Sequence, residues 1–338
     1  MKNFDKSMQD HQLAWRSKHI ESDEKGPWGK DTYEWILPLR LWEEGLWSGI
    51  RSGTSNPLAK YLDDAKVKKH EGVHNLKSSW THCANLYFPF GASDKGKSLL
   101  AGFLGAFVSP AIESISDLQL EYEDEDHNLK PSQLLGETGG GKGFSQTSPD
   151  LGILVNGGRG LLLTENKLLE HHFYPCSGYK AKDSDKHPRA TDKECCNNPL
   201  AGRNAATECQ LLAWKRKYWD YLEPVMNESR FRDLKCCPAS RDGFQLMRQQ
   251  ALAEGIAQSG NYDFVISAVA LDLRNEKLRT CMTSAGIADV REWGTLFNGK
   301  AKFAVWDHQQ WVTWVQEHNT AGEWDNWLEW VKSRYGYA

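Results

Sequence analysis

The fold of this chain is decided by residues 148–167, which read SPDLGILVNGGRGLLLTENK. Two apolar runs flank a glycine-rich segment, a pattern that predicts two antiparallel strands joined by a tight turn. Side chains alternate between the two faces of a strand, so Glu165 and Lys167 project to the same side. A four-residue turn places Asp150 opposite Glu165, and a five-residue turn places it between Glu165 and Lys167. Either register brings the three ionisable groups together at one edge of the hairpin.

These three groups suit metal-dependent cleavage of a phosphodiester. Carboxylate oxygens are ligands that Mg²⁺ prefers, and the ion keeps several waters and phosphate oxygens around it. Asp150 and Glu165 are therefore candidate ligands for Mg²⁺ or Mn²⁺, with a metal-bound water as the nucleophile. Lys167 would orient or deprotonate that water, or stabilise the charge that develops on the phosphate. The sequence leaves these three roles open.

A surface ion pair at the end of a strand is the simpler interpretation of Glu165 and Lys167. An acid followed two residues later by a lysine also occurs at Asp64 and at Asp233. Neither of those triplets ends an apolar strand or has a second acid on a partner strand. The strand context and Asp150 therefore favour the catalytic interpretation, which depends on the structure around the motif.

The Ser-Pro-Asp triplet, the apolar strand and the Glu-Asn-Lys triplet within residues 148–167 resemble the PD-(D/E)xK nuclease superfamily, whose members have the restriction-endonuclease-like fold. Further segments are similar to a little-characterised bacterial branch of that superfamily: residues 74–79, 84–90 and 244–249. The likeness covers roughly residues 70–290. It implies an α/β core with a central mixed β-sheet flanked by helices, and divalent-metal-dependent cleavage of DNA.

The resemblance also implies roles for individual residues. Asp150, Glu165 and Lys167 match the catalytic positions of the superfamily. Gln245 resembles the accessory glutamine on the helix that follows the catalytic hairpin. The tyrosine that often stands four residues later is replaced here by Gln249. Gln245 is therefore a candidate site residue with a less complete match than the other three.

Length and composition favour one sizeable domain with additions. The chain has 338 residues, of which 40% are hydrophobic and 25% charged, enough to bury a large core. We expect a mobile N-terminal segment and a helical preface in residues 1–70, the nuclease core in residues 71–290, and C-terminal helices in residues 291–338. The last part carries tryptophans at helical spacing, which indicates helices that pack on the core: Trp311, Trp314, Trp327 and Trp330.

Charge and hydropathy exclude some partners. The net charge of −4 gives no global basic signal, so contacts with DNA need a local positive cleft. No window approaches the roughly 20 consecutive apolar residues of a membrane-spanning helix, and the first residues lack the apolar core of a secretory signal. We therefore expect a cytoplasmic protein without a membrane partner. In that reducing compartment, thiols are more often buried, catalytic or metal-bound than paired in disulfides.

The cysteines suggest a second metal site, within a cysteine-containing insert at about residues 174–209. This segment is too polar to bury itself, and a thiolate-bound metal would convert binding free energy into folding free energy. A structural Zn²⁺ or an iron–sulfur (Fe-S) cluster would take its ligands from a defined set: Cys176, either Cys195 or Cys196, Cys209, and a fourth among Cys236, Cys237, His187 and His171. The spacing contains no CxxC pair. The alternative is a set of small buried thiols, as we expect for Cys83 and Cys281.

A further acid near the hairpin has two interpretations. Residues 117–123 alternate apolar and polar side chains, which predicts a strand. Glu121 would either face the metal cleft or belong, with the acidic residues that follow it, to the solvated end of that strand. The simpler expectation is the solvated end.

Together these patterns predict a metal-dependent nuclease that acts on DNA, with RNA as an open alternative. Two other interpretations belong to different classes of protein. One is a catalytically silent nucleic-acid-binding or assembly module on a nuclease fold, against which the retention of all three matched groups argues. The other is a cysteine-metal structural protein whose hairpin acids are incidental. The sequence does not determine the oligomeric state.

Overall fold

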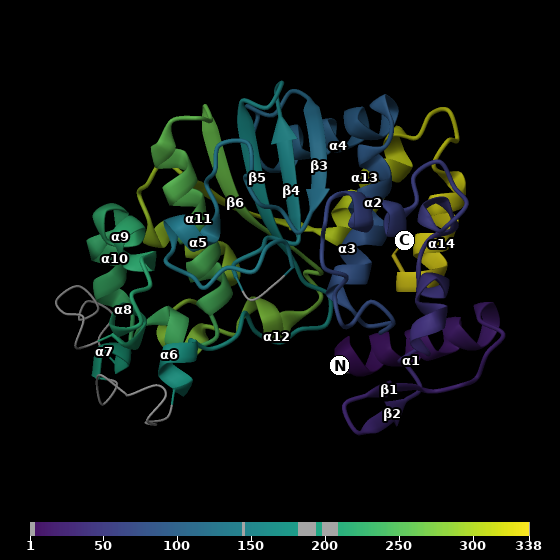
Figure 1. Ribbon diagram of the computed structural model, residues 1–338, viewed down its shortest axis with the longest axis horizontal. Helices are drawn as coiled ribbons and strands as arrows, with labels where there is room; N and C mark the ends of the chain where they lie inside the picture. Colours follow the sequence, from purple (N-terminus) through teal and green to yellow (C-terminus); the bar gives the residue numbers. More distant parts are fainter. Residues whose placement is uncertain (1–3, 144–145, 182–193, 198–208, 338) are drawn as a thin grey trace.

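The computed structural model describes residues 4–143, 146–181, 194–197 and 209–337. Its centre is a five-stranded sheet, in the order β3–β4–β5–β6–β7, between two layers of helices (Figure 1). The strands are β3 (Ile115–Leu120), β4 (Leu151–Val155), β5 (Gly160–Asn166), β6 (Phe264–Leu271) and β7 (Lys302–Asp307). The pairs β3–β4 and β4–β5 are antiparallel, whereas β5–β6 and β6–β7 are parallel. The expected α/β fold with a central mixed sheet is confirmed.

The hairpin β4–β5 has the four-residue turn, the first of the two registers that the sequence left open. Val155 pairs with Gly160 across the turn. Gly157 and Gly158 have φ angles of 72° and 85°, in the left-handed region that glycine enters without steric cost. The turn therefore fixes the register, and the register sets where the ionisable groups beyond the strand ends lie.

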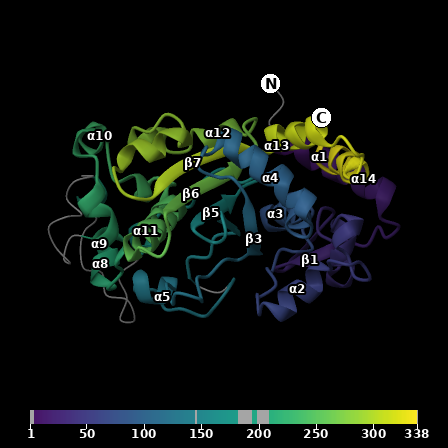
Figure 2. The same cartoon turned by 90° about the horizontal axis from the view of Figure 1, so that it is seen from above.

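Apolar side chains on the two faces of the sheet build two separate cores. On β5, Leu162 packs into the first core, whereas Leu161 and Leu163 pack into the second. The first core also takes side chains from α3 (Ser79–Tyr87), α4 (Asp94–Phe107), α13 (His308–His318) and α14 (Asp325–Tyr335). The second takes side chains from α9 (Tyr218–Leu222) and α11 (Phe244–Ser259), and Figure 2 shows α11 and α3 on opposite sides of β5. Each leucine buried in this way contributes about 1.5–3 kcal/mol, so the central strand is firmly anchored.

The C-terminal tryptophans lie in the first core. Trp311 on α13 and Trp327 on α14 are fully buried. Their indole N–H groups donate to the carbonyl oxygens of Leu86 at 3.1 Å and Asn85 at 2.9 Å, near the end of α3. The terminal helices are therefore hydrogen-bonded to the core as well as packed on it.

Two parts of the chain differ from the sequence expectation. The N-terminal residues, expected to be mobile, include α1 (Phe4–His19), which packs against α14 (Figure 1). Gln12 Nε2 on α1 donates to the carbonyl oxygen of Arg334 at 2.9 Å, and both residues are buried. The C-terminal part contributes β7 in addition to its helices. Burial along β7 runs from the exposed Lys302 to the buried Trp306 without a regular alternation, and pairing with β6 places the strand in the sheet.

The acidic run after β3 is a correction to the expected solvated strand end. The strand ends at Leu120, and Glu121, Glu123 and Asp124 are 5%, 6% and 3% exposed. Distant segments supply their partners: the ammonium of Lys130 pairs with Glu123 at 3.3 Å, and a tyrosine hydroxyl beside β6 donates to Asp124. The expectation was wrong because alternation within one strand does not reveal which distant segments cover its end.

Shorter elements complete the structure: β1 (Gly26–Trp28), β2 (Asp31–Tyr33), the 3₁₀-helix η1 (Leu39–Gly45), α2 (Leu58–Asp64), α5 (Pro131–Leu134), α6 (Ser177–Lys180), α7 (Glu194–Asn197), α8 (Gln210–Ala213), α10 (Glu228–Asp233) and α12 (Glu276–Arg279). Residues 1–70 thus contain two short strands and two 3₁₀-helices, η1 and η2 (Ser48–Ile50), as well as α1 and α2. Among the described helices, none combines the length and the apolar composition that a membrane crossing requires.

Candidate active site

A cavity of about 300 Å³ opens where the hairpin strands meet the start of α11. Its lining includes all four residues that the sequence nominated around the hairpin: Asp150, Glu165, Lys167 and Gln245. Asp150 directly precedes β4, Glu165 is near the end of β5, Lys167 directly follows β5, and Gln245 is in the first turn of α11. Glu121, directly after β3, lines the same cavity. Five ionisable or polar groups from four segments thus meet at one edge of the sheet.

Lys167 is a buried cation. Its Nζ donates to Glu165 Oε1 at 2.7 Å, and the two side chains are 4% and 12% exposed. Burial alone would lower the pKa of the ammonium, but the charges of Glu165, Glu170 and Asp150 raise it above its ordinary value. Lys167 is therefore protonated near neutral pH in this arrangement. It can donate a hydrogen bond and offset negative charge, but it is not poised to remove a proton.

Carboxyl groups share the cavity with that lysine. Asp150 Oδ2 accepts the backbone N–H of Asn166 at 2.8 Å. Desolvation, followed by the charges of Glu165 and Glu121, raises the pKa of Asp150 well above its ordinary value. Burial and the charge of Glu165 likewise raise the pKa of Glu121, to about 7. A cation that binds between such carboxyl groups offsets the repulsion between their charges and favours their ionised forms.

Glu121 reaches the cavity through an unusual backbone angle. Its φ of 52° ends β3 and lies in the left-handed region. Its N–H donates to the carbonyl oxygen of Asp150 at 3.1 Å, so the backbones of the two acids are joined. A residue with a side chain loses about 1–2 kcal/mol in that region, and such strain concentrates at functional sites. The alternation that predicts the strand contains no sign of this angle, so the sequence could not decide between the two positions.

Gln245 is fixed beside the acids by its backbone and its side chain. The N–H groups of Phe244 and Gln245 donate to the carbonyl oxygens of Tyr174 and Phe173, which joins α11 to the segment after the hairpin. Gln245 Nε2 donates to Glu165 Oε1 at 3.0 Å. The Oε1 atom of Gln245 is buried with no hydrogen-bond partner among the described residues, a state that costs about 1–3 kcal/mol. A ligand that brings a donor or a cation would satisfy this oxygen.

The donors in the cavity fit a hard divalent cation. They are the carboxylate oxygens of Glu121, Asp150 and Glu165 and the unpartnered amide oxygen of Gln245, and Mg²⁺ and Mn²⁺ prefer such oxygen ligands. Within the described ranges, however, no group of three or more acidic, histidine or cysteine side chains is already arranged to hold a metal ion. Glu165 Oε1 accepts hydrogen bonds from Lys167 and Gln245. These side chains must therefore shift before that oxygen becomes a ligand.

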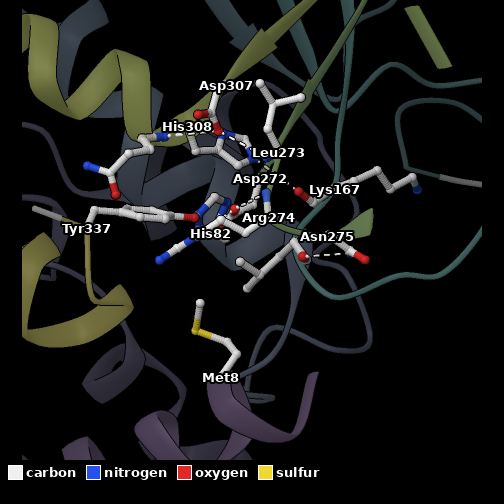
Figure 3. Close-up of polar contacts among 12 residues, drawn as sticks. Met8, His82, Lys167, Asp272, Leu273, Arg274, Asn275, Asp307, His308 and Tyr337 are labelled. Carbon is white, nitrogen blue, oxygen red and sulfur yellow. Dashed lines mark hydrogen bonds and ion pairs between the residues drawn. The ribbon is translucent and has the colours of Figure 1, made fainter. Parts of the chain in front are cut away.

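Behind the cavity, a buried hydrogen-bond network supports the end of β5 (Figure 3). Asn166 Nδ2 donates to the carbonyl oxygen of Ser79 at 2.8 Å and to His82 Nδ1 at 3.2 Å. His82 Nδ1 is therefore an acceptor, and its Nε2 donates to the hydroxyl of Tyr337 at 2.9 Å. Burial lowers the pKa of His82 well below its ordinary value, so the imidazole is neutral, as this bonding requires.

His308 makes the matching contact with the next residue of the chain (Figure 3). Its Nε2 donates to the carbonyl oxygen of Lys167 at 3.0 Å, and its Nδ1 accepts from the hydroxyl of Tyr87 at 2.9 Å. Burial lowers the pKa of His308 to about 4, so this imidazole is also neutral near pH 7. The sequence did not indicate either histidine, because isolated histidines on two distant helices carry no spacing signal.

The loop after β6 completes this rear wall. Asp272, which is fully buried, pairs with Arg274 at 2.6 Å. Asn275 Nδ2 donates to the carbonyl oxygens of Leu168 and Glu170 at 3.3 and 2.9 Å. The residues that follow β5 are therefore held from this loop and from His308 on α13 (Figure 3), whereas Asn166, the last residue of β5, is held from α3.

Four of the candidate cysteines lie near one another, although they come from four segments of the chain. The backbone N–H of Cys237 donates to the carbonyl oxygen of Cys196 at 3.0 Å. Burial raises the pKa of the Cys176 thiol to about 12, and the neighbouring Cys209 and Cys196 add to the effect. Burial also raises the pKa of the Cys237 thiol, with smaller contributions from the other three. These thiols share one region, but among the described residues no three of them are already arranged to hold a metal ion.

The remaining cysteine-site candidates are placed elsewhere or lie outside the described residues. His171 Nε2 contacts the carboxylate of Asp5 on α1. Cys236 faces Arg241, whose pKa is raised by a hydrogen bond with that thiol. His187 and the side chain of Cys195 lie outside the described residues. Cys237 is therefore the fourth candidate that the structure brings to Cys176, Cys196 and Cys209.

Comparison with known proteins identifies a family. The model of the family described as "Restriction Endonuclease associating with ARP" matches residues 9–336. No curated protein and no solved structure shows a significant match to the chain. The family match agrees with the mixed α/β sheet and spans the hairpin, α11 and both terminal helices. Because it covers nearly the whole length, the chain belongs to this restriction-endonuclease-like family.

Proposed function

We propose that the protein is a divalent-metal-dependent nuclease that hydrolyses phosphodiester bonds of DNA. The observation that carries the proposal is the cavity at the end of the hairpin, where Asp150, Glu165 and Lys167 line one space. Membership of a restriction-endonuclease-like family supports nuclease activity and a nucleic-acid substrate in general terms. The choice of DNA and the roles of individual residues go beyond that support.

In this proposal Asp150 and Glu165 hold Mg²⁺ or Mn²⁺, with Gln245 beside them. The bound ion supplies an acidified water and offsets charge on the phosphate. The backbone N–H of Asn166 orients Asp150 through its 2.8 Å hydrogen bond. Lys167 keeps its proton on Nζ and stabilises the negative charge that develops on the phosphate. The two neutral histidines behind the cavity keep the backbone at residues 166–167 in place.

One set of incubations tests the proposal. The purified chain is mixed with linear duplex, circular duplex and single-stranded DNA, and with RNA, in the presence of Mg²⁺, Mn²⁺ or EDTA. We expect cleavage of DNA with either metal and none with EDTA. Circular substrate distinguishes internal cleavage from digestion at ends. Binding without cleavage of any substrate, with both metals, would instead support a catalytically silent nucleic-acid-binding module.

We further propose that Cys176, Cys196, Cys209 and Cys237 hold a structural Zn²⁺ or an iron–sulfur cluster. Backbone contacts between these segments support the proposal: the N–H of Cys237 donates to the carbonyl oxygen of Cys196 at 3.0 Å, and the N–H of Cys176 donates to that of Ala239 at 2.9 Å. A bound metal would hold four separate segments together. Elemental analysis of protein purified without chelator or oxygen tests it: zinc or iron near one site per chain is expected, and neither metal contradicts it.

The family description also bears on partners. It names an association with ARP, and we propose that this chain associates with a protein partner in the same way. The test is the molar mass of the purified chain in solution, alone and after mixing with ARP. A complex of defined stoichiometry is expected, and two species that remain separate at micromolar concentration contradict the proposal.

A further inference from the structure

A second permanent cation lies in the cavity beside Lys167. Arg248 on α11 lines it, three residues after Gln245 and therefore on the same face of the helix. The same cavity is lined by several carboxylates and by His70, whose pKa is lowered by burial. Among the described lining residues, Lys167 and Arg248 are thus the two with a fixed positive charge.

The guanidinium of Arg248 is held through one of its three nitrogens. Its Nε donates to Thr147 Oγ1 at 2.9 Å and to Glu137 Oε1 at 3.2 Å. The side chain of Arg248 is 24% exposed, whereas that of Glu137 is 3% exposed. The two terminal nitrogens of Arg248 make no hydrogen bond with the described residues. The N–H groups that remain form a planar fork, which matches two oxygens of one phosphate.

Glu137 is buried, and both oxygens of its carboxylate accept hydrogen bonds from neighbouring residues. It accepts from the backbone N–H and the hydroxyl of Thr147, the latter at 2.7 Å, and from the hydroxyl of Tyr218 at 2.7 Å. Burial would raise the pKa of Glu137, but Arg248 and these donors together lower it, so the carboxylate is ionised at neutral pH. A carboxylate held by these three donors fixes the position of the arginine that it contacts.

We propose that Arg248 binds a backbone phosphate of the nucleic-acid strand in the cavity, and that Glu137 is its positioning residue. This inference rests on the proposed nuclease function, since it assigns a phosphate-binding group to the same site. The recognition uses oxygen atoms that every nucleotide carries. It therefore adds affinity for any polynucleotide strand without a preference for sequence.

The chain offers a closely matched control in Arg230 on α10. Its Nε donates to Thr295 Oγ1 at 3.1 Å, and its Nη2 pairs with Glu292 at 3.2 Å. The side chain is 33% exposed and does not line the cavity. Arg230→Ala thus removes an arginine that, like Arg248, bonds a threonine hydroxyl and a glutamate carboxylate, but that lies outside the cavity. It controls for loss of charge and loss of an ion pair.

The first experiment measures binding without cleavage. Fluorescence anisotropy in EDTA gives the Kd of the full-length chain for labelled single-stranded DNA, duplex DNA and RNA at several salt concentrations. We expect Arg248→Ala to weaken binding about tenfold or more and to reduce the slope of log Kd against log salt by about one. Arg230→Ala should stay within about twofold of the wild type. An unchanged Kd and salt slope in a folded Arg248→Ala chain overturns the inference.

The second experiment separates positioning from bulk stability. Under cleavage conditions, Arg248→Lys should raise KM more than it lowers kcat, because it keeps the charge and loses the fork. Glu137→Gln should lower kcat/KM, and in the double variant Glu137→Gln/Arg248→Ala the loss should be no larger than in Arg248→Ala alone. Additive losses would mean that Glu137 does not act through Arg248. Arg248→Lys also serves where Arg248→Ala fails to fold.

The outcomes distinguish this inference from the proposed function. If the wild type binds polynucleotides but cleaves none, the nuclease proposal fails and the binding comparison still decides the role of Arg248. If the wild type cleaves DNA and Arg248→Ala binds as tightly as the wild type, the nuclease proposal stands and the inference fails. A wild type that binds no polynucleotide in EDTA or with metal overturns both.

Discussion

At the scale of single residues, the site consists of a buried ion pair in a cavity that holds more acidic than basic groups. Lys167 and Glu165 form that pair, and Asp150 and Glu121 add further carboxyl groups to the same cavity. Buried charges without sufficient partners shift their pKa values so that part of the charge is neutralised. The pKa values of Asp150 and Glu121 are raised first by burial and then by the charge of the neighbouring carboxylates.

Replacing Lys167 tests whether its charge serves catalysis. We expect Lys167→Ala to reduce the single-turnover cleavage rate by about 10²-fold or more, because it removes one group that stabilises transition-state charge. The matched control is Lys235→Ala, which alters the exposed lysine of a similar acid-x-lysine triplet away from the cavity. A Lys167→Ala rate within a few-fold of the wild type would remove this residue from the mechanism.

The raised pKa of Glu121 predicts a pH-dependent stability. A carboxyl group whose pKa is higher in the folded chain stabilises the fold most at low pH, and this contribution is lost as the pH rises through the folded value. Without metal, the thermal midpoint should therefore fall between the ordinary glutamate range and about pH 7. Glu121→Gln should flatten this fall, as followed by circular dichroism in EDTA. A wild-type midpoint that does not change across this range contradicts the expected sign.

At the scale of elements, the hairpin was predictable because its signals are local. Its turn glycines, its apolar runs and the two-residue spacing of Glu165 and Lys167 all lie within 20 consecutive residues, 148–167. β7 was not predictable in the same way, since its burial does not alternate from residue to residue and the strand is ordered by parallel pairing with β6. The position of Glu121 depends on one backbone angle that a sequence pattern does not encode.

The proposed cysteine site makes a prediction about how the short elements around α6 are joined. If Cys176, Cys196, Cys209 and Cys237 hold one metal, Cys176→Ser should release it and allow earlier proteolysis between residues 176 and 209, because binding free energy on the order of 10 kcal/mol is lost. Metal content and the fragments from limited proteolysis are the measurements. Cys281→Ser, outside this group, is the control. Equal metal content and equal cleavage times in both variants would return these thiols to ordinary packing.

At the scale of the whole molecule, the two ends of the described chain meet, and the C-terminal end reaches the support of β5. The N-terminal helix α1 packs on α14, and Tyr337, which follows α14, reaches His82 beside the end of β5 (Figures 1 and 3). The tryptophan spacing predicted helices in this region but not this contact. Hydrogen bonds between residues more than 200 positions apart in the sequence have no local signature.

Removing the hydroxyl of Tyr337 tests the contribution of this distant support. Tyr337→Phe keeps the buried ring but leaves His82 Nε2 without its partner, which should lower the free energy of unfolding by about 1–3 kcal/mol. Chemical denaturation gives this value, and a cleavage assay shows whether the active-site geometry is also affected. Tyr33→Phe, which alters a partly exposed tyrosine whose hydroxyl has no hydrogen bond among the described residues, should be nearly neutral. Equal stability of the two variants would show that the contact contributes nothing.

The contact between Tyr337 and His82 also has a consequence during synthesis of the chain. A ribosome makes the hairpin of residues 148–167 before it makes Tyr337, which follows α13 and α14. Until then, no hydroxyl oxygen accepts a hydrogen bond from His82 Nε2. The hydrogen-bond network that supports the end of β5 is therefore incomplete. We expect nascent chains to lack the proposed nuclease activity until the segment after α14 has docked, because His82 has no partner for its Nε2 before then.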